Sequence, residues 1–193
     1  MTTLNINKSD DPTYRYKMPI ITCQLQGGKI DGRSTILTNL NDVTTAFNTP
    51  SSIVLKFIGF KKGLRVTEKD NSITGHHTSN DIIDIIYQYI DKFVICPNCS
   101  IPELFPIVEG KKKKRKLFFK CSACCQTVEK KGKNSDENKG IDLILKYLEN
   151  NDWKIKKGNM VLSNDTDGLA AVEDNSNEAT LEDNLSSFNP FED

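Results

Sequence analysis

The sequence lacks several features that would place it in a well-defined protein class. No apolar run in its 193 residues approaches the roughly 20 residues that cross a bilayer, and the polar segment from Met1 to Pro12 has no apolar core of a secretory signal. It has only two histidines, His76 and His77, and no Ser/His/Asp constellation, P-loop or glycine-rich dinucleotide fingerprint. We therefore expect a monomeric cytoplasmic protein without a catalytic site of its own.

The chain also lacks a net charge, because 26 Lys and Arg balance 26 Asp and Glu. The charges are nevertheless segregated. Residues 159–193 contain nine acidic side chains and no Lys or Arg, which leaves 26 basic and 17 acidic side chains in residues 1–158, a net charge of +9. A basic body with an acidic tail suggests an anionic partner for the body. Charge alone is equally compatible with a solvated surface and a solubilising tail.

Four of the six cysteines have the spacing of a metal site. They form two Cys-x-x-Cys pairs with 21 residues between them: Cys96, Cys99, Cys121 and Cys124. Each pair can bring two thiolates to one ion, and two pairs complete the Cys₄ shell of a structural zinc site. Disulfides are the competing interpretation, which the absence of a secretory signal disfavours. Cys125 could be a rival ligand but is more simply a spare thiol, and Cys23 is most simply a small core residue.

The hydrophobic pattern predicts an α+β fold, in which a small mixed α/β sandwich is followed by a Cys₄ zinc ribbon and a disordered acidic C-terminal tail. The expected segments are a flexible N-terminal segment (1–13), an α+β domain (14–93), the zinc ribbon (94–133), a C-terminal helix (134–156) and the acidic tail (157–193). Neither folded module is large enough for a deep catalytic cleft.

Several individual elements can be predicted. Ser52–Phe60 is β-branched and aromatic apart from Lys56, which favours a central strand. Apolar residues at three- and four-residue steps predict an amphipathic helix that begins after a Ser79 cap and leads almost directly to Cys96. Ribbon strands are expected near Glu103–Glu109, Lys116–Lys120 and Gln126–Glu129, and a second helix over about Lys139–Asn150.

Four short strings, in the same order, resemble the eukaryotic translation initiation factor 5 family. They are the Tyr-Arg-Tyr-Lys-Met-Pro string Tyr14–Pro19, the Lys-aromatic-x-Gly-aromatic string Lys56–Phe60, the hydrophobic-x-Gly-His turn Ile73–His76 and the helix-to-ribbon segment Phe93–Cys99. The resemblance covers residues 10 to about 150. The beta subunit of initiation factor 2 shares the fold and the ribbon but does not normally carry the first string.

The resemblance implies a GTPase-activating protein for initiation factor 2, the G protein that delivers initiator methionyl-tRNA to the small ribosomal subunit. In the family, the arginine of the first string acts as a finger projected into the GTP site of the partner, and by position this residue is Arg15. A guanidinium offers planar, permanently charged donors to the phosphate oxygens of the transition state. GTP would be bound only by the partner, and the chain would act on its gamma and beta subunits.

Two further cations are candidates for a supporting role in GTPase activation. The family counterpart of Lys56 supports activation, and a second family lysine falls near the turn where this chain has Arg33. From the residues alone, Lys56 can also be a lysine on the solvent face of a half-exposed strand.

The sequence is most basic between the two cysteine pairs. From Glu109 to Lys133 there are ten basic and two acidic residues, a local net charge of +8. Six of the cations are consecutive: Lys111, Lys112, Lys113, Lys114, Arg115 and Lys116. At a hairpin tip they predict salt-dependent contact with ribosomal RNA phosphates or with the initiator tRNA backbone. A nuclear localisation signal and a merely solvated tip are the alternatives.

The chain departs from the family in ways that leave other functions open. Cys125 stands where the family has glycine after the fourth cysteine, which should strain the knuckle. We expect the family's helical-repeat C-terminal domain to be absent, and the acidic-aromatic segment Leu181–Asp193 to dock on the beta subunit in its place. An inert tail, or a tail that masks the basic tip, is the alternative. The competing functions are a ribosome- or RNA-binding module and a decoy that blocks the cellular factor, in a divergent, truncated or virus-encoded chain acting in the host cytoplasm.

Overall fold

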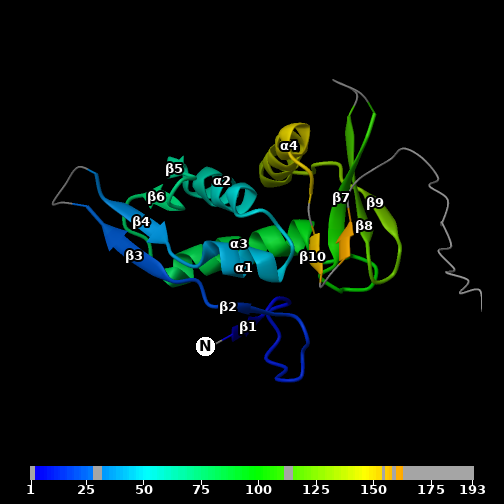
Figure 1. Cartoon of the computed structure of the whole chain (residues 1–193), viewed down its shortest axis with the longest axis horizontal. Coiled ribbons are helices and arrows are strands. Elements are labelled where there is room, and N and C mark those ends of the chain that lie inside the picture. Colours follow the sequence, from blue (N-terminus) through cyan, green and yellow to red (C-terminus); the bar gives the residue numbers. More distant parts are fainter. Residues whose placement is uncertain (1–2, 28–31, 111–114, 154, 158–159, 163–193) are drawn as a thin grey trace, which may run out of the picture.

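The computed structural model describes residues 3–27, 32–110, 115–153, 155–157 and 160–162. Figure 1 shows a long helix, α3 (Ser79–Phe93), that runs from a small sheet at one end of the molecule to a three-stranded ribbon at the other. The sheet is antiparallel in the order β3-β4-β6-β5. Its strands are β3 (Cys23–Gln26), β4 (Ser34–Leu37), β5 (Val66–Thr67) and β6 (Ser72–Thr74).

The core of the first region lies between this sheet and three helices. Leu37 and Ile73 from the sheet are fully buried, as are Val43 of α1 (Leu40–Ala46), Phe57 of α2 (Ser51–Lys62) and Ile86 of α3. These elements form the mixed α/β part of the predicted α+β fold, which is confirmed.

The helix α3 has the predicted amphipathic pattern, but its cap lies one residue earlier than expected. Thr78, rather than Ser79, is the N-cap residue, because its side chain accepts a hydrogen bond from the Asp81 N–H while the Asp81 carboxylate accepts one from the Thr78 N–H. His77, just before the cap, donates its backbone N–H to the Thr35 hydroxyl at 3.0 Å. The histidines therefore belong to the turn that leads into α3.

The strand predicted over Ser52–Phe60 is wrong, because these residues form α2. The helix follows Pro50 and ends at Gly63, whose φ of 67° is left-handed and suits glycine. Ile53, Val54, Leu55, Phe57 and Ile58 are all buried, so the helix is apolar on most of its circumference. A short apolar run of this kind has no helical period that could distinguish it from a buried strand.

The predicted flexible segment 1–13 is also wrong for the part that the structure describes. β1 (Thr3–Asn5) pairs antiparallel with β2 (Lys17–Pro19), and the Ile6 side chain is fully buried. The hydroxyl of Tyr87 on α3 donates to the Asn5 carbonyl at 3.0 Å, and Lys8 forms an ion pair with Asp91 of the same helix at 3.5 Å. The N-terminal segment is thus packed against α3.

The ribbon is formed by three antiparallel strands, in agreement with the prediction. They are β7 (Leu104–Glu109), β8 (Lys116–Cys121) and β9 (Thr127–Glu129), in the order β7-β8-β9. Its joint with the first region is aromatic, since the rings of Phe93 at the end of α3 and Phe119 of β8 lie 6.2 Å apart between centroids. Both side chains are buried, so the ribbon and the α/β region share one core.

The last helix, α4 (Ser135–Asn150), begins four residues before the predicted start and packs against α2 and β7. Asp136 in its first turn accepts hydrogen bonds from Lys61 of α2 at 2.7 Å and Lys92 of α3 at 3.4 Å. One turn later, Gly140 lies so close to Phe93 that an added Cβ would overlap the ring. A glycine and an ion pair therefore fix α4 to the other helices.

A short hairpin of β10 (Ile155–Lys157) and β11 (Met160–Leu162) follows α4 at the point where the acidic tail was predicted to begin. Residues 163–193 of that tail lie outside the described residues. Among the helices that the structure describes, none is both long enough and apolar enough to pass through a lipid bilayer.

Candidate metal centre and arginine loop

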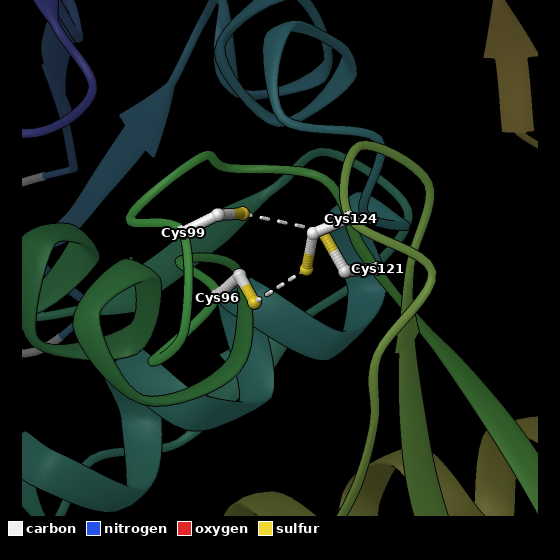
Figure 2. Close-up of side chains that lie close together, drawn as sticks. All are labelled: Cys96, Cys99, Cys121 and Cys124. Atoms are coloured by element: carbon white, nitrogen blue, oxygen red, sulfur yellow. Dashed lines mark hydrogen bonds between the residues drawn. The ribbon is translucent and has the colours of Figure 1, made fainter.

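The two cysteine pairs converge on one point at the base of the ribbon. Figure 2 shows the four sulfur atoms directed toward one another, two from the loop after α3, one from the end of β8 and one from the turn that follows β8. All four Sγ atoms lie within 4.8 Å of one another, and Cys96–Cys124 and Cys99–Cys121 are each separated by 3.7 Å between sulfurs. A tetrahedral zinc site with Zn–S bonds of about 2.3 Å has sulfurs about 3.8 Å apart, so this donor set fits a zinc ion.

The backbone of the two knuckles is the same. The N–H of Ser100 donates to the Cys96 carbonyl, and the N–H of Cys125 donates to the Cys121 carbonyl, both at 2.9 Å. The residue after each second cysteine is left-handed, with φ of 58° at Ser100 and 59° at Cys125. The strain predicted for Cys125 is therefore present, because this backbone conformation favours glycine.

The environments of the thiols differ within this centre. The Gln126 N–H and the Asn98 side chain both donate to the Cys124 sulfur and lower the pKa of Cys124 to about 6. Burial raises the pKa of the Cys121 thiol to about 12. A buried thiolate needs a cation, and a divalent ion bound by all four sulfurs would supply that charge.

The other two cysteines take no part in the cluster. Cys125 is exposed, and Cys23 is half-buried on β3. In the described parts of the chain, the four predicted ligands are the only group of three or more His, Cys, Asp or Glu side chains placed to hold one ion.

Arg15 lies in an ordered loop that we call the arginine loop, residues 6–16 between β1 and β2. The loop is closed where the Ile6 N–H donates to the Tyr16 carbonyl at 3.0 Å. From Tyr14 to Met18 the side chains alternate, with Tyr14, Tyr16 and Met18 turned inward and Arg15 and Lys17 exposed. Arg15 therefore lies between two inward-facing tyrosines, and its own side chain faces solvent.

The two tyrosines beside Arg15 differ in what they contact. The Tyr16 hydroxyl donates to Oε1 of Glu103 in the ribbon at 2.7 Å, whereas the Tyr14 hydroxyl is buried without a hydrogen-bond partner in the part of the chain that is described. The Arg15 guanidinium lies 5.9 Å from the Tyr16 ring centroid. Glu103 was not among the predicted functional residues, and no local sequence pattern indicates a partner 87 residues away.

The two predicted supporting cations lie on other elements. Lys56 is on the exposed side of α2, where it forms an ion pair with Glu68 at 2.8 Å and lines an open hollow of about 530 Å³ between α2 and α4. Arg33 precedes β4, and its carbonyl accepts a hydrogen bond from the Gly75 N–H at 2.8 Å. In Figure 1, α2 and the β1–β2 segment lie on opposite sides of α1 and α3, and the β3–β4 hairpin projects at the far end of the molecule from the ribbon. The structure therefore does not bring Arg15, Lys56 and Arg33 together.

The basic tip of the ribbon is described only in part. Lys111–Lys114 lie outside the described residues. Arg115 forms an ion pair with Glu149 of α4, and Lys116 lies 3.6 Å from Glu129. Contact of this tip with RNA stays a prediction.

Comparisons with known proteins match the region that contains both the arginine loop and the cysteine centre. A family model for a domain found in initiation factors 2B and 5 matches residues 6–127. The chain is 34% identical to eukaryotic translation initiation factor 5 of Mus musculus over 127 residues, which cover 63% of this chain and 29% of that protein. For the factor of Saccharomyces cerevisiae the values are 33% over 127 residues, 63% and 30%, and for that of Dictyostelium discoideum 30% over 127 residues, 64% and 31%. The match thus spans about three tenths of the length of these relatives. The family model ends before α4 begins.

Proposed function

The chain belongs to the family defined by the domain of initiation factors 2B and 5, and from that premise we propose that it is a GTPase activator of the initiation factor 5 type. It would stimulate GTP hydrolysis by initiation factor 2 on the small ribosomal subunit during start-codon selection. It is not itself an enzyme in this proposal, because it supplies a residue to a nucleotide bound by its partner. The observation that carries the proposal is the exposure of Arg15 between two half-buried tyrosines, one of which is hydrogen-bonded to the ribbon, inside the matched region.

Arg15 has the chemistry that phosphoryl transfer requires. Negative charge spreads over the γ-phosphate oxygens in the transition state, and a guanidinium in contact with them stabilises that charge. An arginine supplied in trans typically raises the hydrolysis rate by about 10³–10⁵, which corresponds to roughly 4–7 kcal/mol. The inward-facing tyrosines leave the guanidinium as the group that projects from this part of the loop.

The zinc centre would have a structural part in this function. One Zn²⁺ bound by the four cysteines would hold the two knuckles and thereby the base of the ribbon. Because Glu103 lies between the first knuckle and β7, the same centre supports the residue to which Tyr16 is hydrogen-bonded. The ion takes no part in GTP hydrolysis.

Contacts with the rest of the initiation complex would come from other surfaces. Lys56 lies on α2 and Arg33 before β4, on other elements than the arginine loop, so we assign them contacts with the gamma or beta subunit of initiation factor 2. The cations 111–116 would contact phosphates of ribosomal RNA or of initiator methionyl-tRNA.

Single-turnover GTP hydrolysis tests the proposal. The reaction would contain initiation factor 2 with GTP, initiator methionyl-tRNA and the small ribosomal subunit, with and without this protein. Arg15→Ala should lose the stimulation, and Arg15→Lys should lose most of it because an ammonium makes fewer directed contacts. Arg65→Ala, which removes another exposed arginine outside the arginine loop, is the matched control and should keep the wild-type rate. Equal rates for wild type and Arg15→Ala would disprove the finger assignment.

A binding module or decoy is the second candidate, and the local charge of +8 between Glu109 and Lys133 is the observation that favours it. Such a protein would bind the small subunit with strong salt dependence but would leave GTP hydrolysis unchanged. Neutralising Lys111–Lys116 should flatten the salt dependence of binding. A chain that binds, does not stimulate hydrolysis and displaces the cellular factor would be the decoy.

A further inference from the structure

The arginine loop has internal hydrogen bonds in addition to the Ile6–Tyr16 backbone bond that closes it. The Asn5 side-chain amide donates to the Ser9 carbonyl at 2.6 Å and to the Asp11 carbonyl at 2.7 Å. The Asp11 carboxylate accepts from the Thr13 N–H and hydroxyl at 2.8 and 2.6 Å. These bonds shape the loop from within, and two contacts leave it: Lys8 near its start pairs with Asp91 of α3, and Tyr16 at its end reaches the ribbon.

Tyr16 connects this loop to the ribbon through a side-chain hydrogen bond. Its hydroxyl donates to the Glu103 carboxylate at 2.7 Å, and this bond, with burial, raises the pKa of Tyr16 to about 12. Tyr14 has the same functional group two residues earlier, but its hydroxyl is buried without a hydrogen-bond partner in the described structure. The centroids of the two rings lie 5.9 Å apart. Two neighbouring tyrosines of the same loop therefore differ in whether their hydroxyl is hydrogen-bonded.

Glu103 is itself held by the cysteine knuckles. Its N–H donates to the Ile101 carbonyl at 2.9 Å, and its carbonyl accepts from the Ser122 N–H at 3.0 Å. Ile101 accepts a further hydrogen bond from the Cys96 N–H at 3.0 Å, and Ser122 follows Cys121 directly. The partner of Tyr16 is therefore connected through backbone bonds to both halves of the metal centre.

We propose that Tyr16 is a positioning residue for Arg15, because its hydrogen bond to Glu103 fixes the arginine loop to the zinc-binding knuckles. The effect on GTP hydrolysis rests on the proposed function, whereas the anchoring of the loop does not. Removing zinc should loosen the Tyr16 end of the loop by the same route, since Glu103 loses its support when the knuckles unfold.

Three substitutions test the hydrogen bond between Tyr16 and Glu103. Tyr16→Phe keeps the ring beside the guanidinium and deletes only the hydroxyl, and Glu103→Gln keeps the size of the acceptor but removes its charge. Tyr14→Phe is the matched control, because it deletes a hydroxyl that bonds to nothing in the described structure. A hydrogen bond to a charged group contributes on the order of a tenfold change in an equilibrium constant, and partial exposure reduces this to roughly three- to tenfold here.

An arginine-specific protease gives a readout that needs no GTPase. Cleavage after Arg15, followed by mass spectrometry and compared with cleavage after Arg33 in the same sample, reports how often the loop leaves its position. Tyr16→Phe should be cleaved roughly three- to tenfold faster at Arg15. Glu103→Gln should show a smaller increase, because its amide oxygen still accepts the hydrogen bond, and Tyr14→Phe should match wild type. A zinc chelator should speed cleavage at Arg15 in wild type more than in Tyr16→Phe, in which the anchor is already absent.

Single-turnover GTP hydrolysis is then measured with the same variants. Tyr16→Phe should lower the stimulated rate roughly three- to tenfold, with unchanged zinc content and unchanged affinity for the initiation complex. An unchanged stimulated rate in Tyr16→Phe, despite faster cleavage at Arg15, would overturn the positioning role.

The two hypotheses fail in different ways. If wild type gives no stimulation, the proposed function fails, while faster cleavage of Tyr16→Phe than of Tyr14→Phe still supports the anchor. Equal cleavage of Tyr16→Phe, Tyr14→Phe and wild type overturns the anchor whatever the GTPase result.

Discussion

Replacing Cys125 with glycine should tighten zinc binding, because it removes backbone strain from the second knuckle. Cys125 has φ of 59°, and its exposed side chain lies outside the group of four sulfurs. Its N–H donates to the Cys121 carbonyl, so the left-handed conformation is required by the turn that presents the cysteine pair to the metal. The substitution therefore changes the conformational preference of one residue and leaves the metal ligands in place.

The magnitude follows from two opposing effects. A non-glycine residue in the left-handed region is destabilised by roughly 1–2 kcal/mol. Glycine loses more conformational freedom on folding, which offsets roughly 0.5–1 kcal/mol of that gain. The net stabilisation of the folded knuckle is about 0.5–1 kcal/mol, which corresponds to a zinc dissociation constant roughly two- to fivefold lower if metal binding and folding are coupled.

Competition with a chromophoric chelator under reducing conditions measures this change. Ser100→Gly is an independent repeat in the first knuckle, because Ser100 is exposed and has φ of 58°. Cys125→Ser keeps the strain and removes the thiol, so it should bind zinc like wild type, and Cys125→Val should bind more weakly because β-branched residues tolerate this region poorly. Weaker binding by Cys125→Gly would refute the strain argument, and loss of zinc from Cys125→Ser would make Cys125 a ligand.

Three further outcomes are expected. The wild-type chain should contain one zinc ion by elemental analysis and the Cys121→Ser/Cys124→Ser variant none; zinc retained in that variant would remove both residues as ligands. Gly140→Ala should reduce the free energy of unfolding, measured in urea, by about 1 kcal/mol. Overlap of the added methyl group with Phe93 costs roughly 1–3 kcal/mol, and the better helix propensity of alanine offsets about 1 kcal/mol of this. A more stable variant would contradict the close contact. Asp136→Asn should destabilise the protein by about 1 kcal/mol at pH 7. Because the hydrogen bond from Lys61 lowers the pKa of Asp136, the difference in free energy of unfolding between wild type and variant should disappear as the pH falls below about 4. A difference independent of pH would exclude the charged interaction.

The metal ligands and the amphipathic helix could be predicted from the sequence because both depend on local spacing. Two cysteines separated by two residues converge within one turn of backbone, and the two knuckles need only a hairpin to meet. In α3, apolar residues recur at three- and four-residue steps because one face of that helix is buried and the other is exposed. In both cases a feature of the folded structure, the ligand spacing or the buried helix face, is visible as a short-range pattern in the sequence.

The helix α2 could not be predicted in the same way. Its buried residues Ile53–Leu55 and Phe57–Gly59 surround most of its axis, so burial imposes no period on the sequence. The β-branched and aromatic composition favours a strand, and tertiary packing between the sheet, α3 and α4 overrides it. The boundary signals Pro50 and Gly63 are present, but they are compatible with either element.

Sequence by itself determined that an arginine stands between two tyrosines, Tyr14 and Tyr16, and the tertiary structure decided that both rings turn inward while the guanidinium faces solvent. Only the tertiary structure decided what holds it there. The hydroxyl of Tyr16 meets a carboxylate 87 residues away, at 2.7 Å, because α3 carries the ribbon back to the N-terminal strands. A contact of that kind depends on the length and direction of an intervening helix, and those are properties of the packed chain that neither partner's local sequence contains.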